Sequence, residues 1–376
     1  MNYQSLLKRR SSRQKQRPYI FLLSAFVLCA ILLNACSSAN TPGASTTASG
    51  APTSLPTASI SPTLKSQGEM QLQAFQQWIA LMQQFGSDAT PYQQQYTGDQ
   101  QALTSAQTSS AYQSALTTLN THVDGIKIPA TKAEAQGLQQ QLQQKATDWG
   151  KQHTYHDTSN NTTYPLGYEY GSDGIGGWVQ GELSTAQTIA DYQWSIDELY
   201  KSLTNFQAMT DNFGDKTPYN QPHKTDLQLL QHYGDMDKRV VVVSLAEQAM
   251  RVYDHGKLVK AFLVTTGRPD KPSLPGAWWV EGKKSPTVFK AGVPKSSPYW
   301  YPDTPIHYAM QYHSDGYFIH DSWWRVTYGP GTNYPHQDAS GDPFSSQGSH
   351  GCVNISLADA TWLYSFVVVY TPMLMY

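Results

Sequence analysis

Cysteine is scarce in this chain, with only 3 among 376 residues. Cys29 and Cys36 lie in or just after an apolar N-terminal run, so Cys352 is the only thiol in the rest of the sequence. So few thiols exclude a disulfide framework, and no CxxC pair typical of a structural zinc site is present. A thiol that stands alone in this way suggests that the thiol itself is needed.

Charge is sparse as well. Charged residues make up 14% of the chain and the formal net charge is −2. Basic residues cluster only near the N-terminus, so the sequence carries no electrostatic footprint for nucleic acid. With 39% hydrophobic residues, the chain is long enough for two compact units plus tails.

The basic N-terminal cluster has another explanation. Lys and Arg residues between positions 8 and 17 precede an apolar run at 19–33, which is shorter than the span of about 20 residues that crosses a membrane. This order is typical of a secretory signal. The run ends in Leu33-Asn34-Ala35-Cys36, which resembles a bacterial lipobox and implies removal of residues 1–35 and lipidation of Cys36. An ordinary signal peptide, or an uncleaved anchor that contains Cys36, is the alternative.

Residues 36–66 are nearly all Ser, Thr, Ala, Pro and Gly, with Lys65 as the only charge. Such a composition cannot form a core, so we expect a semi-extended linker. Behind a lipid anchor, this linker would hold the folded part away from the membrane.

Residues 67–214 are rich in Gln and have a helical period. Apolar residues recur every three or four positions, which predicts three or four helices packed as a small all-α bundle. The series are 72–82, 112–123, 135–149 and 189–206. Pro91, the Asp124-Gly125 turn with Pro129, and the loop at 160–177 are predicted to separate them. A glycan-binding or partner-binding module is the alternative, but no residue pattern supports it.

Residues 215–237 contain Pro218 and Pro222 and are predicted to connect the helical region to a mainly-β domain at 238–376. Strands are expected at 239–245, 249–253 and 258–265, the last two joined by a hairpin turn. Ser356 to Asp359 matches a capping box, which predicts a short helix. Strands at 367–369 and 372–376 are expected to complete the sheet.

The most informative motif is Ser349-His350-Gly351-Cys352-Val353-Asn354. A free thiol has a pKa of about 8.5, so it needs a partner such as imidazole to be a good nucleophile at neutral pH. His320 is a candidate, because it ends an apolar run upstream. Gly351 lets the backbone approach a substrate, so nearby amides could face a developing oxyanion.

Ile319-His320-Asp321 together with the cysteine motif resembles the catalytic domain of L,D-transpeptidases, the YkuD family. Thr265-Thr266-Gly267 and Leu274-Pro275-Gly276 match turns of the same family. The resemblance covers the last part of the chain and nothing before residue 238. One departure is the separation of His320 from Cys352. It is greater than in short members of the family, and we interpret 323–347 as an enlarged loop.

The resemblance implies the following roles. Cys352 is the nucleophile and His320 the base, and the backbone carbonyl of Asp321 orients the imidazole. The amides near Gly351 and Cys352 are the oxyanion donors. Ser349, His350 and Asn354 are candidates for substrate binding, although purely structural hydrogen bonds remain open for His350 and Asn354. A flap over the donor site is expected among the aromatic residues Tyr299, Trp300, Tyr301, Tyr308 and Tyr312.

No cofactor and no metal are implied. His307, His313 and His336 lie in the same region and could join Cys352 in a zinc site, but their spacing does not match a zinc motif.

The expected function is that of an exported, lipid-anchored L,D-transpeptidase acting on peptidoglycan stem peptides for wall cross-linking or remodelling. We expect it on the outer face of the cell membrane or in the cell envelope. The alternatives are an L,D-carboxypeptidase, in which water accepts the acyl group, and a wall-binding lipoprotein without catalysis. The sequence gives no indication of oligomeric state.

Overall fold

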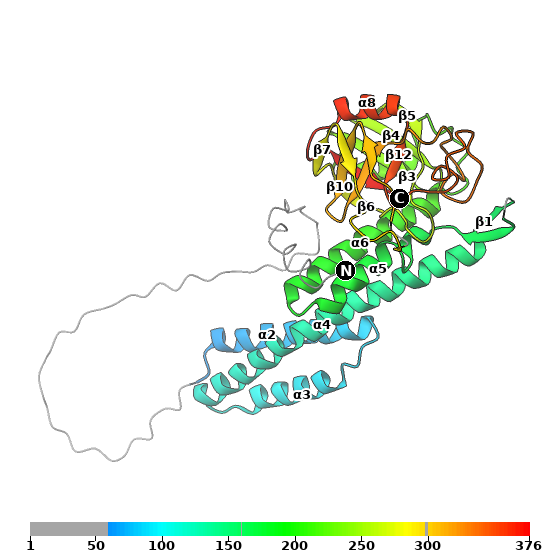
Figure 1. Ribbon diagram of the computed structural model, residues 1–376. Coiled ribbons are helices and arrows are strands. Elements are labelled where there is room, and N and C mark those ends of the chain that lie inside the picture. Colours follow the sequence, from blue (N-terminus) through cyan, green and yellow to red (C-terminus); the bar gives the residue numbers. More distant parts are fainter. Residues whose placement is uncertain (1–58, 159, 298–299) are drawn as a thin grey trace, which may run out of the picture. The chain divides into compact units, whose positions relative to one another are not determined.

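The computed structural model describes residues 59–158, 160–297 and 300–376 (Figure 1). The predicted signal peptide, Cys36 and most of the predicted linker lie outside these residues. The first described helix, α2 (Pro62–Gln84), begins with a proline at its N-terminus, and the Ser61 side chain accepts a hydrogen bond from the Leu64 amide at 3.2 Å. Residues 62–66, which were predicted as linker, are therefore helical.

Helices α2, α3 (Thr90–Ser105) and α4 (Ser109–Gln152) pack together around one apolar cluster (Figure 1). Phe75, Ile79 and Met82 of α2 meet a stripe on α4 that includes Leu119 and Ile126. These are the apolar series seen in the sequence, so the predicted bundle is confirmed here.

The predicted break at Asp124-Gly125 and Pro129 is wrong, because α4 runs through all three residues. A proline inside a helix costs about 3 kcal/mol, mainly through a lost backbone hydrogen bond and a steric clash. The apolar stripe nevertheless continues across it, with Ile126 and Ala130 fully buried. Burial on both sides of Pro129 is the physical reason that the helix persists.

The loop predicted at 160–177 is partly regular, and the segment that leads into it from α4 is too. Together they contain a hairpin of β1 (Thr154–Asp157) and β2 (Thr162–Pro165) and a 3₁₀ turn, η1 (Tyr168–Tyr170). Helix α5 (Ile175–Thr185) begins inside the predicted loop. Helix α6 (Ile189–Asn212) opens with a capping box formed by Thr188 and Asp191, and α7 (Lys224–His232) lies in the predicted connector.

The C-terminal domain is mainly β, as predicted. A 5-stranded sheet has the order β5-β4-β3-β13-β6. Its strands are β3 (Arg239–Ser244), β4 (Ala249–Asp254), β5 (Lys257–Leu263), β6 (Gly276–Trp279) and β13 (Pro372–Met375). The helix expected after the cysteine motif is α8 (Leu357–Phe366), capped by Ser356. The strand predicted at 367–369 is absent, because these residues form the turn that leads from α8 into β13.

A 4-stranded sheet of order β12-β11-β10-β7 packs against the first one. It consists of β7 (Gly282–Lys284), β10 (Ala309–His313), β11 (Tyr317–Asp321) and β12 (Val353–Ile355). A separate hairpin pairs β8 (Thr287–Phe289) with β9 (Thr304–Ile306). The core between the two sheets includes Val241 and Val243 of β3, Met310 of β10 and Ile319 of β11.

The other face of β3 belongs to a second core that it shares with the helices. Val240 and Val242 cluster with Leu199 and Phe206 of α6, because successive strand residues point to opposite faces. The Asn205 side chain also donates to the Met375 carbonyl at 2.9 Å. The helices and the β domain accordingly form one compact unit, Thr57–Tyr376, where chain length had allowed two. The predicted boundary near residue 237 marks a change of secondary structure and not a break in packing.

A buried ion pair ties α7 to the sheet. Arg251 and Asp226 are both fully buried, and the Arg251 Nη2 donates to Asp226 Oδ1 at 3.0 Å. The hydroxyls of Tyr253 and Tyr376 each donate to the same carboxylate at 2.7 Å. The Asp226 carboxylate thus accepts hydrogen bonds from Arg251, Tyr253 and Tyr376.

Asp226→Asn is expected to lower the free energy of unfolding by about 3 kcal/mol, the low end for a broken buried pair, because Arg251 then keeps only the partly exposed Glu247 as an acidic partner at 2.8 Å. Urea denaturation measures this loss. Asp148→Asn is the matched control: it removes the partner of Lys151 in an exposed pair, for which about 1 kcal/mol or less is expected. Equal effects of the two substitutions would contradict the prediction.

Candidate active site

Two neighbouring strands bring the predicted site residues together. Strand β11 pairs with β12 in parallel register, which places His320 opposite Asn354. Cys352 directly precedes β12, two residues before Asn354. On its other side the motif pairs with the turn at 265–267, where Asn354 exchanges backbone hydrogen bonds with Thr265 at 2.8 and 3.0 Å. The cysteine motif is therefore held by backbone bonds on both sides.

His320 is oriented by a backbone carbonyl. Its Nδ1 lies 2.8 Å from the Asp321 carbonyl oxygen, which can only accept, so Nδ1 carries the proton and Nε2 is the basic nitrogen. The Asn354 amide group donates to Nε2 at 3.1 Å. Burial lowers the pKa of His320 to about 4, against the raising effect of the Asp321 carbonyl, so the imidazole is neutral at pH 7.

The Asp321 side chain has a different task. Its carboxylate accepts hydrogen bonds from the backbone amides of His307 at 2.9 Å and Tyr308 at 2.7 Å, and it meets His307 Nδ1 at 2.9 Å. It thus holds the segment between β9 and β10, while only its main chain contacts His320. This is the contact that the family resemblance implied.

The Cys352 thiol is half-buried and protonated at neutral pH. Burial raises its pKa to about 11, against a lowering backbone hydrogen bond from Phe318. The sulfur lies 3.9 Å from the Gly316 carbonyl oxygen, in the turn between β10 and β11. A thiol in this state needs a base at the moment of attack, and a neutral imidazole on the adjacent strand can supply one.

Gly351 occupies a position that other residues could not. Its φ is +112°, and a Cβ there would lie 2.7 Å from the Tyr317 ring. Its carbonyl accepts from Ser273 Oγ at 2.8 Å and from the Tyr312 hydroxyl at 3.3 Å. Because a trans peptide directs its N–H opposite to its C=O, the Cys352 amide points away from these two residues.

The predicted oxyanion donors must be revised. The Gly351 amide, one of the two, donates to Ser349 Oγ at 3.0 Å and is therefore occupied. Ser349 Oγ in turn donates to the Cys352 carbonyl at 2.5 Å. Ser349, two residues before Gly351, closes this tight turn with its hydroxyl. The spacing of the motif residues alone does not reveal this contact. The Cys352 amide remains the oxyanion candidate.

His350 lies on the rim of the site. Its ring is stacked near that of Tyr301, with ring centroids 5.7 Å apart. Burial lowers its pKa to about 4, and the positive charges of Lys271 and Arg268 add to this. Ser349 and Asn354 act here through internal hydrogen bonds, so their predicted role in substrate binding stays a prediction.

The β8–β9 hairpin forms one wall of the site. Phe289 packs edge-on against His320, with ring centroids 5.0 Å apart, and also contacts Phe318. Tyr301 belongs to this wall. Of the other aromatic residues predicted in a flap, Tyr308 packs on Tyr364 of α8 and Tyr312 is buried under Gly351. The Trp300 ring lies near Lys295, and Tyr299 is outside the described residues.

The segment 323–347, predicted as an enlarged loop, is irregular but internally bonded. Arg325 is buried and donates to the carbonyls of Phe344, Ser345 and Gln347 at 3.1–3.3 Å. Burial lowers the Arg325 pKa to about 10. Asp338 accepts from the Thr327 amide at 2.9 Å. Sequence reasoning missed Arg325, for which no local pattern gives a signal.

The extra histidines do not gather around Cys352. His307 meets Asp321, His313 packs beside Trp178 and Trp278, and His336 contacts the Tyr334 carbonyl. No group of three or more His, Cys, Asp or Glu residues suited to a metal ion occurs in residues 59–158, 160–297 and 300–376. Within the same ranges, no helix combines the length and apolar character needed to cross a membrane.

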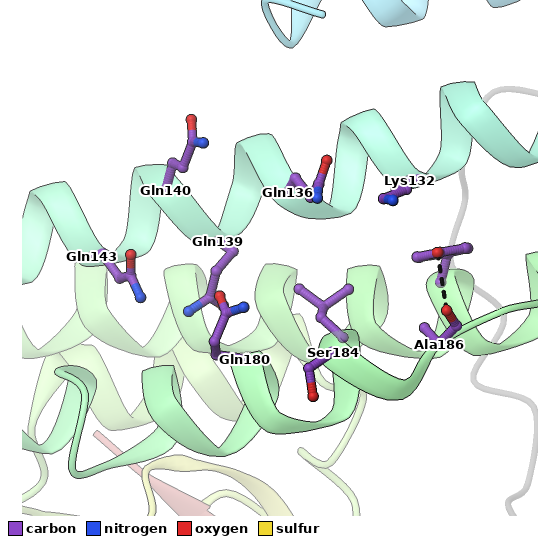
Figure 2. A pocket seen from close by; sticks show the side chains of 10 residues that line it. Lys132, Gln136, Gln139, Gln140, Gln143, Gln180, Ser184 and Ala186 are labelled. Carbon is purple, nitrogen blue, oxygen red and sulfur yellow. Dashed lines mark hydrogen bonds between the residues drawn. The ribbon is translucent and has the colours of Figure 1, made fainter.

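A pocket of about 500 Å³ lies elsewhere, between α4, α5 and the start of α6 (Figure 2). Glutamine supplies five of its ten lining residues, and Lys132 is the one charged residue among the ten. Gln139 is one of the lining residues, and its amide donates to the Gly176 carbonyl at 2.8 Å. Glutamine is common over all of these helices, so the lining reflects their general composition and assigns no chemistry.

Residues 238–375 match the L,D-transpeptidase catalytic domain, YkuD. The matched range contains Cys352, His320 and every other residue of the site described above. The resemblance seen in the sequence is thereby confirmed for the C-terminal part, and the helices before it lie outside the L,D-transpeptidase domain.

Curated relatives of this domain include two proteins of Mycobacterium tuberculosis. L,D-transpeptidase 1 is 25% identical over 152 residues, which are 39% of this chain and 53% of that protein. L,D-transpeptidase 2 is 23% identical over 180 residues, 47% of this chain and 40% of that protein. The chain thus spans about half the length of these relatives, or less. The catalytic domain of an Enterococcus faecium L,D-transpeptidase is 28% identical, with 37% of this chain and 98% of that one covered and a TM-score of 0.30.

Proposed function

We propose that the protein is an L,D-transpeptidase that acts on peptidoglycan tetrapeptide stems through an acyl-enzyme on Cys352. The observation that carries this proposal is the arrangement of His320. Its Nδ1 proton is fixed on a carbonyl, and its basic Nε2 belongs to the strand adjacent to the only thiol of the described residues. A neutral base paired with a protonated thiol suits attack on a neutral amide.

In the first half-reaction, Nε2 of His320 accepts the thiol proton as Sγ attacks the carbonyl carbon of the L-centre of the diamino acid. The Asn354 amide must release Nε2 for this step. The bond between that carbon and the D-alanine nitrogen then breaks. The imidazolium returns its proton to the leaving nitrogen, so D-alanine departs as an amine and a thioester remains.

In the second half-reaction, an amine of a neighbouring stem attacks the thioester. His320 removes a proton from the amine, the C–S bond breaks, and the imidazolium returns that proton to Sγ to restore the thiol. Both tetrahedral intermediates carry negative charge on oxygen, and the Cys352 amide is the donor proposed to stabilise it. If water replaces the amine, the same site acts as an L,D-carboxypeptidase.

Incubation of the purified protein with a tetrapeptide stem tests the proposal. We expect release of D-alanine together with a cross-linked dimer, both detected by mass spectrometry. Release of D-alanine with a free tripeptide only would make the protein a carboxypeptidase. Binding of the stem without release of D-alanine would leave only the wall-binding alternative.

We also propose that the protein is exported and anchored by lipid on Cys36. A basic leader, an apolar run, the lipobox-like Leu33-Asn34-Ala35-Cys36 and a Ser/Thr-rich tether support this. One acyl chain gives only marginal membrane binding, and a diacylglyceryl cysteine provides the second chain needed for a stable anchor.

Cys36→Ala is expected to move the protein from the membrane fraction to a soluble or uncleaved form, with the chemistry at Cys352 unchanged. Labelling with a fatty-acid probe and intact mass of the mature protein measure this. A wild-type protein that carries no lipid and is cleaved at another position would refute the anchor.

A further inference from the structure

The residues from 154 to 178 that the structure describes, which run from the end of α4 into the start of α5, reach the L,D-transpeptidase domain at the turns that flank Cys352. We call this stretch the bridging segment. It lies wholly outside the matched range 238–375, yet its side chains hydrogen-bond to residues of that range. Two of these contacts lead to the cysteine by short routes.

The first route starts at Trp178 of α5. Its indole Nε1 donates to Asp315 Oδ2 at 3.0 Å, and its ring packs edge-on against His313 at 5.0 Å and Trp278 at 6.1 Å between centroids. Asp315 and Gly316 are neighbours in the turn between β10 and β11. The Gly316 carbonyl contacts the Cys352 sulfur. By holding Asp315, Trp178 therefore fixes the turn that the thiol faces.

The second route starts at Tyr168 of η1. Its hydroxyl donates to the Gly267 carbonyl at 2.6 Å and accepts from the Asn333 amide at 2.9 Å. The Gly267 amide donates to Ser273 Oγ at 3.0 Å, and that hydroxyl donates to the Gly351 carbonyl at 2.8 Å. Tyr168 is thus connected through two further hydrogen bonds to the peptide that sets the direction of the Cys352 amide.

A third contact braces the same segment. Tyr155 of β1 stacks on Tyr334 of the long loop, with centroids 4.2 Å apart and ring planes 10° apart. Tyr168 also packs edge-on against Tyr334. The bridging segment is therefore fixed by aromatic packing at Tyr168, where the second route begins.

We propose that Trp178 and Tyr168 are positioning residues for Cys352, so that the helical region completes the active site. Trp178 acts through Asp315 on the turn beside the thiol. Tyr168 acts through Gly267 and Ser273 on the oxyanion side. The inference rests on the proposed function only for its substrate readout, since the reactivity of the thiol can be measured without a stem peptide.

Trp178→Phe in the full chain tests the first route, since it keeps an aromatic ring but removes the N–H donor. We expect the rate of acylation at saturating stem to fall about tenfold, with KM changed less than twofold, because loss of one hydrogen bond to a charged group is of this order. A loosened turn also admits water to the thiol. The pH midpoint of Cys352 alkylation by iodoacetamide should then move down towards the ordinary thiol value.

Trp149→Phe is the matched control, because the Trp149 indole N–H is buried in the helical region and has no hydrogen-bond partner there. It should leave both readouts unchanged. Asp315→Asn retains an acceptor for the indole and should stay near wild type, while Asp315→Ala should reproduce Trp178→Phe. In the double variant, the losses from Trp178→Phe and Asp315→Ala should not add, because both substitutions remove the hydrogen bond between Trp178 and Asp315.

Tyr168→Phe tests the second route, with Tyr170→Phe as its control in the same turn. The Tyr170 hydroxyl is buried without a partner, whereas that of Tyr168 holds Gly267. We expect only Tyr168→Phe to lower acylation, again about tenfold and with little change in KM.

The proposal would be overturned if folded Trp178→Phe kept the wild-type pH midpoint of alkylation and folded Tyr168→Phe kept the wild-type rate of acylation. So would equal losses in the Trp149→Phe and Tyr170→Phe controls. If the wild-type protein does not process the stem but Trp178→Phe still shifts the alkylation midpoint, the proposed function fails and the positioning role stands.

Discussion

Cys352→Ala is expected to abolish release of D-alanine from a tetrapeptide stem and covalent labelling by a carbapenem. The proposed pathway passes through a thioester on this sulfur, so its removal leaves no route for the acyl group. Loss of an enzyme nucleophile costs on the order of 10⁴-fold or more in rate. Release of D-alanine and intact mass after incubation with the carbapenem are the measurements.

The substitution should leave the fold intact, because the sulfur contacts only backbone groups, the Gly316 carbonyl at 3.9 Å and the Phe318 amide. Thermal unfolding checks this and separates a chemical loss from a structural one. Substantial turnover by folded Cys352→Ala would show that another residue is the nucleophile.

His320→Ala is expected to lower the acylation rate by two or more orders of magnitude, about the range that loss of a general base produces. The pH dependence gives the sharper measurement. The wild-type pKa values are about 4 for His320 and about 11 for Cys352. Acylation should rise through about pH 4, as the imidazolium loses its proton, and then stay level through neutral pH.

In His320→Ala the rise near pH 4 should vanish, and the remaining rate should increase with pH as the thiol itself ionises. His350→Ala is the control, because the pKa of His350 is also lowered to about 4. If His320→Ala kept the wild-type profile and His350→Ala lost it, the base would be His350.

Much of the fold was predictable because its signals are local. Strands such as β3 and β4 show in their apolar content, and the capping box at Ser356 marks the start of α8. Pro129 shows the limit of such rules, because burial of Ile126 and Ala130 against α2 and α3 outweighs a local helix breaker. The core shared by β3 and α6 joins distant segments, so no sequence window contains it.

The residues of the site also divide into those with a local signal in the sequence and those without one. Cys352, His320 and the carbonyl of Asp321 are predicted from contiguous motifs, and the structure shows the contact between His320 and that carbonyl. The occupied Gly351 amide was not predicted, since it depends on the turn that Ser349 closes. Ser273, Tyr168 and Trp178 lie far from the motif in sequence, and their hydrogen bonds exist only once the chain has folded.

The position of β13 has a consequence for the order of events during synthesis. This strand follows all the others in the sequence, yet it lies inside the sheet, parallel to β3 and antiparallel to β6. A nascent chain therefore cannot join β3 to β6 until residues 372–375 have emerged. Pairing over such a sequence separation is slow, because loop closure must precede the favourable contacts. If the protein is exported as an unfolded chain, the sheet that packs behind the strands of the candidate site would be completed only after residues 372–375 have crossed the membrane.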